Sequence, residues 1–164
     1  MKCHFLRHGL AVEADEWNGT DFDRPLTDEG RAQMKHVAKA MDALHLEIDV
    51  IVTSPLVRAK QTASIVAKTL RLQNRVVEDE RLGGEFGPDR LADVLAQHRT
   101  VNAVMLVGHE PGMSRTLGHL VGGAHIEFKK GSLACVNVPD PPSLQGELVW
   151  LIPAKVLAPK GSDT

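Results

Sequence analysis

Short apolar runs, separated by longer amphipathic stretches, set the pattern of this chain. The first run covers residues 3–6 and is typical of a buried strand that opens into a loop. A second run, over residues 49–53, is rich in β-branched side chains and apolar on both faces, as central parallel strands are. A third run covers residues 101–107. The pattern therefore predicts three buried strands at these positions.

Two helices are predicted after the first two runs. Thr27 is a suitable N-cap, and Asp28 and Glu29 occupy the first turn, where the positive end of the helix dipole favours acids. The apolar face of this helix comprises Met34, Val37, Ala38, Met41 and Leu44. Ser54 and Pro55 predict the start of the next helix, with serine as the cap and proline in the first helical position. Its apolar face comprises Leu56, Ala59, Ala63, Val66, Ala67 and Leu70.

The remaining segments continue an alternation of strands and helices. A weaker strand is expected near residues 75–77, a helix begins at Pro88, and a short helix covers residues 113–121. Two final strands are expected over residues 132–138 and 147–152. Strands that alternate with helices indicate an α/β fold with parallel strands in the middle of its sheet.

Three segments are expected to be irregular. Residues 10–26 lack helical periodicity, and we expect a long loop there, of a length that is often functional. Glycines mark another loop within residues 81–90, and the two loops would form the rim of a site at the sheet edge. Residues 1–158 are interpreted as a single domain, and residues 159–164 as a loose C-terminal tail.

Composition narrows the classes of function. The 164 residues include 19 basic and 21 acidic side chains, for a formal charge of −2. This balance argues against nucleic acid as a partner, although a local pocket for one phosphate is compatible with it. No apolar run approaches the ~18 residues of a membrane span. Residues 1–7 reach a charge too early for a signal peptide, so we expect no membrane association and a cytoplasmic location.

The chain has two cysteines, Cys3 and Cys135, and both lie in apolar runs. We interpret them as small buried residues rather than as a disulfide. A reducing compartment, which is the default without an export signal, agrees with this interpretation.

The residues that carry chemistry follow the three predicted strands. Arg7 and His8 follow the first strand. Arg58 lies about one turn into the helix after the second strand, and His109 follows the third. Because ligands of open α/β sheets bind beyond the carboxyl ends of the strands, neighbouring strands would bring these residues to one pocket. Guanidiniums match phosphate oxygens and helix starts add positive dipole ends, so the set predicts a site for a phosphoryl group.

Four motifs occur in order along nearly the whole chain: Leu6-Arg7-His8-Gly9, Pro25-Leu26-Thr27-Asp28-Glu29-Gly30, Thr53-Ser54-Pro55-Leu56-Val57-Arg58-Ala59-Lys60-Gln61-Thr62, and Val107-Gly108-His109-Glu110-Pro111. With them the chain resembles the histidine phosphatase superfamily (phosphoglycerate mutase-like). Its short length, its Arg24-Pro25-Leu26-Thr27 sequence and its lack of the large insertions of mutases and phytases make it most similar to the small SixA-type phosphohistidine phosphatases. The resemblance implies a three-layer sandwich with a mostly parallel central sheet flanked by helices.

The resemblance also implies that His8 is the nucleophile and forms a covalent phosphohistidine, which water then hydrolyses. A neutral imidazole attacks phosphorus with one ring nitrogen while the other donates to a backbone carbonyl. Neighbouring arginines lower the pKa of such an imidazole, because like charges disfavour its protonated form. Arg7, Arg58 and His109 would bind the phosphoryl oxygens and neutralise charge in the transition state. These fixed cations replace the magnesium used by other phosphoryl-transfer enzymes, so we expect no metal and no other cofactor.

Arg24 is a further candidate for phosphate binding. It precedes a helix start and could reach the phosphate or an acidic patch on a protein substrate. A surface salt bridge with Asp21 or Asp23 is an equally good interpretation.

The proton donor is open at this stage. Mutase-like members place a glutamate after the strand that follows the second-arginine helix, and Glu80 matches that place. Its close competitors, in an acidic run typical of a solvated loop, are Glu78, Asp79 and Glu85. A phosphorylated imidazole can be protonated on its distal nitrogen and leave neutral, whereas an alkoxide needs a positioned acid. Our hypothesis is that Glu80 assists with phosphate esters and is nearly dispensable for phosphohistidine.

The leading interpretation is a phosphohistidine phosphatase that acts on a phosphorelay protein. The first alternative is a phosphatase of the same superfamily for a small phosphate ester such as a sugar phosphate, and the shape of the pocket rim separates the two. The second is a phosphate-sensing module that binds without turnover. A metal site built from His8, His109 and nearby acids is disfavoured, because the two arginines would repel a divalent cation.

Overall fold

A mixed six-stranded sheet forms the middle layer of residues 1–158, the part of the chain that the computed structural model describes. The tail expected over residues 159–164 lies outside the described residues. In chain order the strands are β1 (Lys2–Arg7), β2 (Val50–Thr53), β3 (Val76–Glu78), β4 (Ala103–Gly108), β5 (Leu133–Asp140) and β6 (Gln145–Ile152). Across the sheet their order is β3-β2-β4-β1-β5-β6.

The carboxyl ends of three parallel strands meet at one edge of this sheet. β4 lies between β1 and β2 and is parallel to both. Arg7 pairs with Gly108, and Thr53 pairs with Val107, so the three strands end almost level. β3 is also parallel to β2, whereas β5 and β6 extend the other side of the sheet with antiparallel pairings. The expectation that β1, β2 and β4, the strands that precede the candidate residues, are neighbours in the sheet is therefore confirmed.

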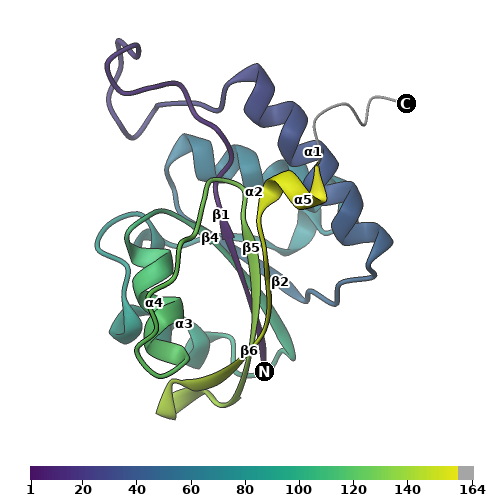
Figure 1. The fold of residues 1–164 in the computed structure, drawn as a ribbon, viewed down its shortest axis with the longest axis vertical. Coiled ribbons are helices and arrows are strands. Elements are labelled where there is room, and N and C mark those ends of the chain that lie inside the picture. Colours follow the sequence, from purple (N-terminus) through teal and green to yellow (C-terminus); the bar gives the residue numbers. More distant parts are fainter. Residues whose placement is uncertain (159–164) are drawn as a thin grey trace.

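Helices cover both faces of the sheet (Figure 1). One face carries α1 (Asp28–Ala43), α2 (Val57–Leu70) and the short α5 (Ala154–Leu157). The other carries α3 (Pro88–Gln97) and α4 (Gly112–Leu120). This arrangement confirms the predicted three-layer α/β sandwich.

Neighbouring residues of each strand feed the two halves of the core. Phe5 of β1 and Leu106 of β4 pack in the cluster under α3 and α4. Leu6 and Val107, the next residues along, pack in the cluster under α1 and α2. All four side chains are fully buried, and each contributes about 1.5–3 kcal/mol relative to an exposed position. Burial on both faces explains why the strands read as continuous apolar runs.

The start of α1 is fixed against the loop that precedes it. Thr27 caps the helix as predicted, because its Oγ1 accepts a hydrogen bond from the backbone N–H of Gly30 at 2.9 Å. The backbone N–H of Thr27 donates to the carbonyl of Leu10 at 3.0 Å. A Cβ at Gly30 would lie only 2.1 Å from that carbonyl oxygen, so glycine permits this close approach. The other end of the helix differs from the prediction, since Leu44 is the C-cap and its side chain is 55% exposed.

The start of α2 is also displaced from its predicted position. The helix begins at Val57 with Leu56 as N-cap, not at Ser54 and Pro55. Ser54 still receives a hydrogen bond from the backbone N–H of Leu56 at 3.2 Å, which closes a turn ahead of the helix. Arg58 is consequently the second helical residue rather than one turn in.

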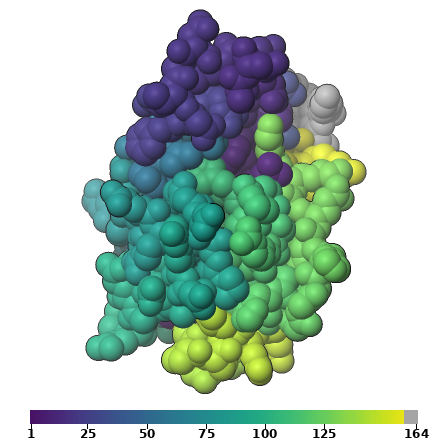
Figure 2. Space-filling view, turned by 90° about the vertical axis from the view of Figure 1, so that its left-hand side faces the viewer, coloured from purple at the N-terminus to yellow at the C-terminus, as the bar shows by residue number. Residues whose placement is uncertain are grey.

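The irregular segments follow the predictions more closely. Residues 10–26 form a long loop, pinned at its base by a bridge between Ala11 and Leu26. It projects at one end of the molecule as the dark purple cap of Figure 2.

Cys3 and Cys135 are buried and free. No helix in residues 1–158 is long and apolar enough to cross a membrane.

Candidate active site

Three loops leave the level strand ends together and carry the candidate residues. His8 directly follows β1, Ser54 follows β2, and His109 follows β4. The backbone N–H of His8 donates to the carbonyl of Gly108 at 3.1 Å, and that of Ser54 donates to the carbonyl of Val107 at 2.9 Å. These bonds extend the parallel pairing one residue past each strand and hold the three loops side by side.

His8 is buried and oriented by its own backbone. His8 is only 5% exposed, and its Nδ1 lies 2.7 Å from the carbonyl oxygen of Gly9. A carbonyl only accepts, so Nδ1 carries the proton and Nε2 keeps its lone pair. Burial, together with the nearby His109, Arg58 and Arg7, lowers the pKa of His8 to about 3. The imidazole is therefore neutral and available as a nucleophile at neutral pH.

His109 lies beside the ring of His8. Their ring centroids lie 5.1 Å apart, with the planes tilted by 51°. Nε2 of His109 lies 2.7 Å from Oγ of Ser54, whose oxygen also accepts the N–H of Leu56. The hydroxyl proton of Ser54 is then free to point at Nε2, which leaves the proton of neutral His109 on Nδ1. Burial, followed by the charge of Arg58, lowers the pKa of His109 to about 4.

Arg7 and Arg58 are anchored through their terminal nitrogens, and Nε of each guanidinium stays unused. Nη1 of Arg7 donates to the carbonyl of Phe128 at 2.9 Å. Nη1 of Arg58 donates to the backbone carbonyl of Asp21 at 2.7 Å, and its Nη2 donates to the Asp21 carboxylate at 3.1 Å. The Nε atoms of both arginines are buried without a hydrogen-bond partner among the described residues. Burial lowers the pKa of both guanidiniums, against the opposing charges of Glu110 at Arg7 and of Asp21 at Arg58.

The unused donors belong to groups that lie close to His8. Nδ1 of His109 is the third buried nitrogen of this set without a partner among residues 1–158, beside Nε of Arg7 and Nε of Arg58. Both arginines lower the pKa of both histidines, which places the four groups within electrostatic reach of one another. An unpaired buried polar group costs about 1–3 kcal/mol. A tetrahedral oxyanion that accepts from all three nitrogens would remove that cost.

Arg24 lies behind Arg58 and shares its carboxylate. Nε and Nη2 of Arg24 donate to Oδ1 of Asp21 at 3.0 and 2.8 Å, and Nη1 donates to the carbonyl of Val12 at 2.8 Å. Of the two salt-bridge partners considered from the sequence, the structure selects Asp21. Desolvation acts to raise the pKa of Asp21, but the two guanidiniums outweigh it and hold that pKa below its ordinary value. Asp21 thus joins Arg24 to Arg58.

Glu80 lies at the start of a short 3-10 turn, residues 80–82, beside the end of β4. Its side chain is exposed and forms no hydrogen bond or ion pair with another described residue. Two of its competitors are already engaged, since Asp79 pairs with Arg81 and Glu78 pairs with Lys60. The side chain of Glu80 is therefore exposed and unpartnered among the described residues, and its role stays a prediction.

Three contributors to the site were not identified as such from the sequence. Ser54 was interpreted as a helix cap, although its place directly after a strand end was a usable signal. Asp21 was considered only as a partner of Arg24. The carbonyl of Phe128 belongs to a segment with no chemical motif. The described residues contain no cluster of three or more His, Cys, Asp or Glu side chains with the geometry of a metal site.

Comparisons with known proteins agree with this geometry. The model of the histidine phosphatase superfamily (branch 1) matches residues 3–87. An uncharacterized protein of Picosynechococcus sp. is 33% identical over 138 residues, which cover 81% of this chain and 82% of that protein. The solved structure of the protein histidine phosphatase SixA complexed with tungstate has a TM-score of 0.79 at 23% identity and covers 96% of this chain and 99% of its own. The α-ribazole phosphatase from Shigella flexneri has a TM-score of 0.76 at 17% identity and covers 94% and 97%.

Proposed function

This chain belongs to the histidine phosphatase superfamily, and on that premise we propose that it is a phosphohistidine phosphatase with His8 as its nucleophile. The substrate would be a phosphorelay protein that carries the phosphoryl group on a histidine. The observation that carries the proposal is the set of three buried, unpartnered nitrogens on Arg7, Arg58 and His109 around a neutral imidazole.

Binding would satisfy those three nitrogens first. The phosphoryl oxygens accept hydrogen bonds from Nε of Arg7, Nε of Arg58 and Nδ1 of His109. Each guanidinium is already held from behind, by Phe128 and Asp21, so little side-chain freedom is lost when the anion arrives. Donors arranged in advance around the charge are the main source of stabilisation in phosphoryl transfer.

Transfer then proceeds in two balanced steps. The lone pair on Nε2 of His8 forms a bond to phosphorus while the phosphorus–nitrogen bond of the substrate breaks on the opposite side. The departing imidazole is protonated on its distal nitrogen by solvent and leaves neutral. In the second step water attacks phosphorus, the bond to Nε2 breaks, and inorganic phosphate leaves with the oxygen of that water. The hydrogen bond from Nδ1 to Gly9 stabilises the positive charge of the phosphorylated ring.

The environment of Glu80 favours phosphohistidine over esters as the substrate. A phosphoramidate needs no positioned acid, and the exposed Glu80 has no partner among the described residues that would fix its direction. SixA, which has a similar fold, is a protein histidine phosphatase, and its structure with tungstate contains a tetrahedral oxyanion. Phosphoryl transfer by fixed cations also makes turnover independent of added metal in this proposal.

A substrate panel tests the proposal. We expect hydrolysis of a phosphohistidine peptide and a phosphorelay protein at rates well above those for sugar phosphates, with His8→Ala as the blank and unchanged rates in a chelator. Faster turnover of sugar phosphates would favour a small-ester phosphatase. Binding of phosphate without any phosphorylated enzyme would indicate a sensing module. Glu80→Gln should lower turnover of esters and spare phosphohistidine, so an equal loss on both would refute the role assigned to Glu80.

A further inference from the structure

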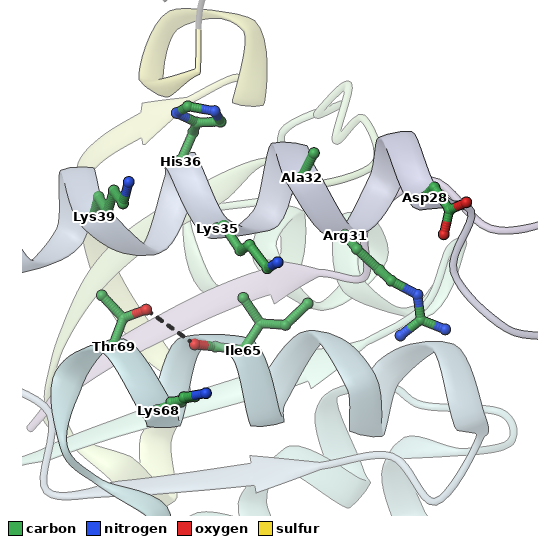
Figure 3. A pocket seen from close by; sticks show the side chains of 9 residues that line it. All are labelled: Asp28, Arg31, Ala32, Lys35, His36, Lys39, Ile65, Lys68 and Thr69. Carbon is green, nitrogen blue, oxygen red and sulfur yellow. Dashed lines mark hydrogen bonds between the residues drawn. The ribbon is translucent and has the colours of Figure 1, made fainter. Parts of the chain in front are cut away.

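A basic groove between α1 and α2 lies outside the proposed active site. It has a volume of about 680 Å³ and opens between the two helices on the outer side of one layer (Figure 3). Arg31 and Lys35 point from α1 toward α2, whose Ile65 lies between the helices. Lys39 continues the row along α1, and Lys68 adds a cation from α2. The chain as a whole has a formal charge of −2, so this groove is a local reversal of sign.

Folding does not explain these four cations. Arg31, Lys35 and Lys39 follow one another at intervals of four residues, a spacing at which like charges destabilise a helix. Neither they nor Lys68 form an ion pair with another described residue. Asp28 is the single acid among the described residues that line the groove. These side chains are therefore available to bind an external anion.

The geometry favours an extended anion over a compact one. Intervals of four residues place successive cations about 6 Å apart along α1, so three of them span about 12 Å. At the strand ends, by contrast, the two arginines and two histidines lie within electrostatic reach of one another. Carboxylates at intervals of four on another helix repeat with the same spacing. Ile65, which lies between the two helices, would contact an aliphatic side chain of such a helix.

One end of the groove lies at the edge of the sheet where β1, β2 and β4 end. α2 begins just after Ser54, and the cap of α1, Thr27, is bonded to Leu10 near His8, so both helices start at the strand-end edge. Arg31 belongs to the first turn of α1 and lies at that end of the groove. We propose that the groove is a docking surface for an acidic amphipathic helix of a protein partner. That this partner is the phosphorylated substrate protein rests on the proposed function.

A binding titration tests the docking surface by itself. The probe is a fluorescent synthetic helix about five turns long, with glutamates at intervals of four and leucines on the adjoining face, compared with its glutamine counterpart. At low salt we expect the glutamate helix to bind about tenfold more tightly, and the difference to vanish at 1 M salt, where the Debye length is about 3 Å. Equal affinity for the two helices would overturn the proposal.

Single charge reversals locate the binding. Lys35→Glu and Lys39→Glu should each weaken the glutamate helix about fivefold. Arg99→Glu is the matched control, because it reverses one exposed cation on the connection between α3 and β4, and it should change affinity less than twofold. An equal effect of all three variants would overturn the assignment to the groove. Displacement of the helix by inorganic triphosphate at equal ionic strength would show a compact anion site instead.

A hydrolysis assay separates this inference from the proposed function. A phosphohistidine peptide joined to the glutamate helix should show a KM about fivefold lower than one joined to the glutamine helix, with the same kcat. Lys35→Glu should abolish that difference. If both peptides are hydrolysed with the same KM, the docking role fails and the phosphatase stands. If neither is hydrolysed, the phosphatase fails and the titration still decides whether the groove binds an acidic helix.

Discussion

Two histidines four residues apart on the same stretch of chain, His4 and His8, differ in what surrounds them. Both are buried, and each has one ring nitrogen close to a backbone carbonyl, that of Glu47 or that of Gly9. Burial is the main cause of a low pKa in both, about 4 for His4 and about 3 for His8. Each also has an aromatic ring as a neighbour, Trp150 at 5.8 Å from His4 and His109 at 5.1 Å from His8, measured between ring centroids.

The difference lies in the cations around each ring. The charged neighbour of His4 is Lys2, whose ammonium is already paired with Glu47. His8 instead faces Arg7 and Arg58, whose Nε atoms have no partner among the described residues. A buried neutral imidazole is therefore not by itself a nucleophile. The position past a parallel strand end, where other strands deliver donors, is what distinguishes the two.

The largest expected effect is on the two histidines themselves. His8→Ala should lower phosphatase activity by about 10⁴-fold or more, because the atom that bonds to phosphorus is gone. His4→Gln should stay within a few fold of the wild type. Initial rates measure the loss, and labelled phosphate retained on the enzyme after an alkaline quench measures the intermediate. A labelled His8→Ala enzyme, or an inactive but folded His4→Gln enzyme, would reverse the comparison.

The next effect concerns the cations that His4 lacks. Arg58→Ala should lower kcat/KM by about 10²–10³-fold, the loss typical of one donor to a developing charge. Arg24→Ala should cost about tenfold or less, since Arg24 acts on Arg58 through the Asp21 carboxylate. Steady-state kinetics on a phosphohistidine peptide give both numbers. A larger loss for Arg24→Ala would place its guanidinium on the phosphate itself.

A smaller effect is expected from the hydroxyl that orients His109. Ser54→Ala should lower kcat/KM about tenfold, because the proton of neutral His109 is no longer directed to Nδ1. The nitrogen chemical shifts of the His109 ring, measured by NMR, should change from one tautomer to a mixture. Unchanged shifts alongside a lost rate would mean that Ser54 supports the backbone rather than the ring.

The smallest effect concerns what His4 and His8 share. Their pKa values are lower in the folded chain, about 4 and 3, than the 6.5 of an exposed histidine. The unfolded chain then binds more protons between these values, so their contribution to stability is fully present above pH 6.5 and is lost as the pH falls toward 4 and then 3. Thermal unfolding across this range should show a melting temperature that falls on acidification. His4→Gln should make the fall shallower, and an unchanged slope would contradict the assigned pKa of His4.

The sequence predicted the position of the candidate site better than the hydrogen bonds among its residues. Arg7, His8 and His109 could be placed because apolar runs end sharply and parallel strand ends share an edge. The position of Ser54 at the strand end was predicted correctly, but its role as the helix cap was wrong. A serine before proline is a common helix start, and the hydrogen bond to His109 joins residues 55 positions apart. Leu44 was expected in the core, but the helix ends at Ala43 and turns it outward.

Other parts of the site depend on loop conformation, which side-chain periodicity does not encode. Either Asp21 or Asp23 could have paired with Arg24 by spacing alone. The loop decides, because Asp23 is instead the acceptor for the hydroxyl of Thr20. The orientation of Glu80 is likewise a property of its turn, and the apolar run that precedes it gives no information about where the carboxylate points.

The clamp on Arg7 sets a limit on when catalysis can begin during synthesis. Its guanidinium is held by the carbonyl of Phe128, and the backbone carbonyls of Arg7 and His8 both receive the N–H of Gly131. A nascent chain that has emerged only as far as α4 already contains the four groups proposed to handle phosphate. It still lacks Phe128 and Gly131, which hold Arg7 and His8 in place. A nascent chain would therefore become active only after Phe128 and Gly131 have been translated and have folded against the end of β1, and shorter fragments would be inert although they carry every motif.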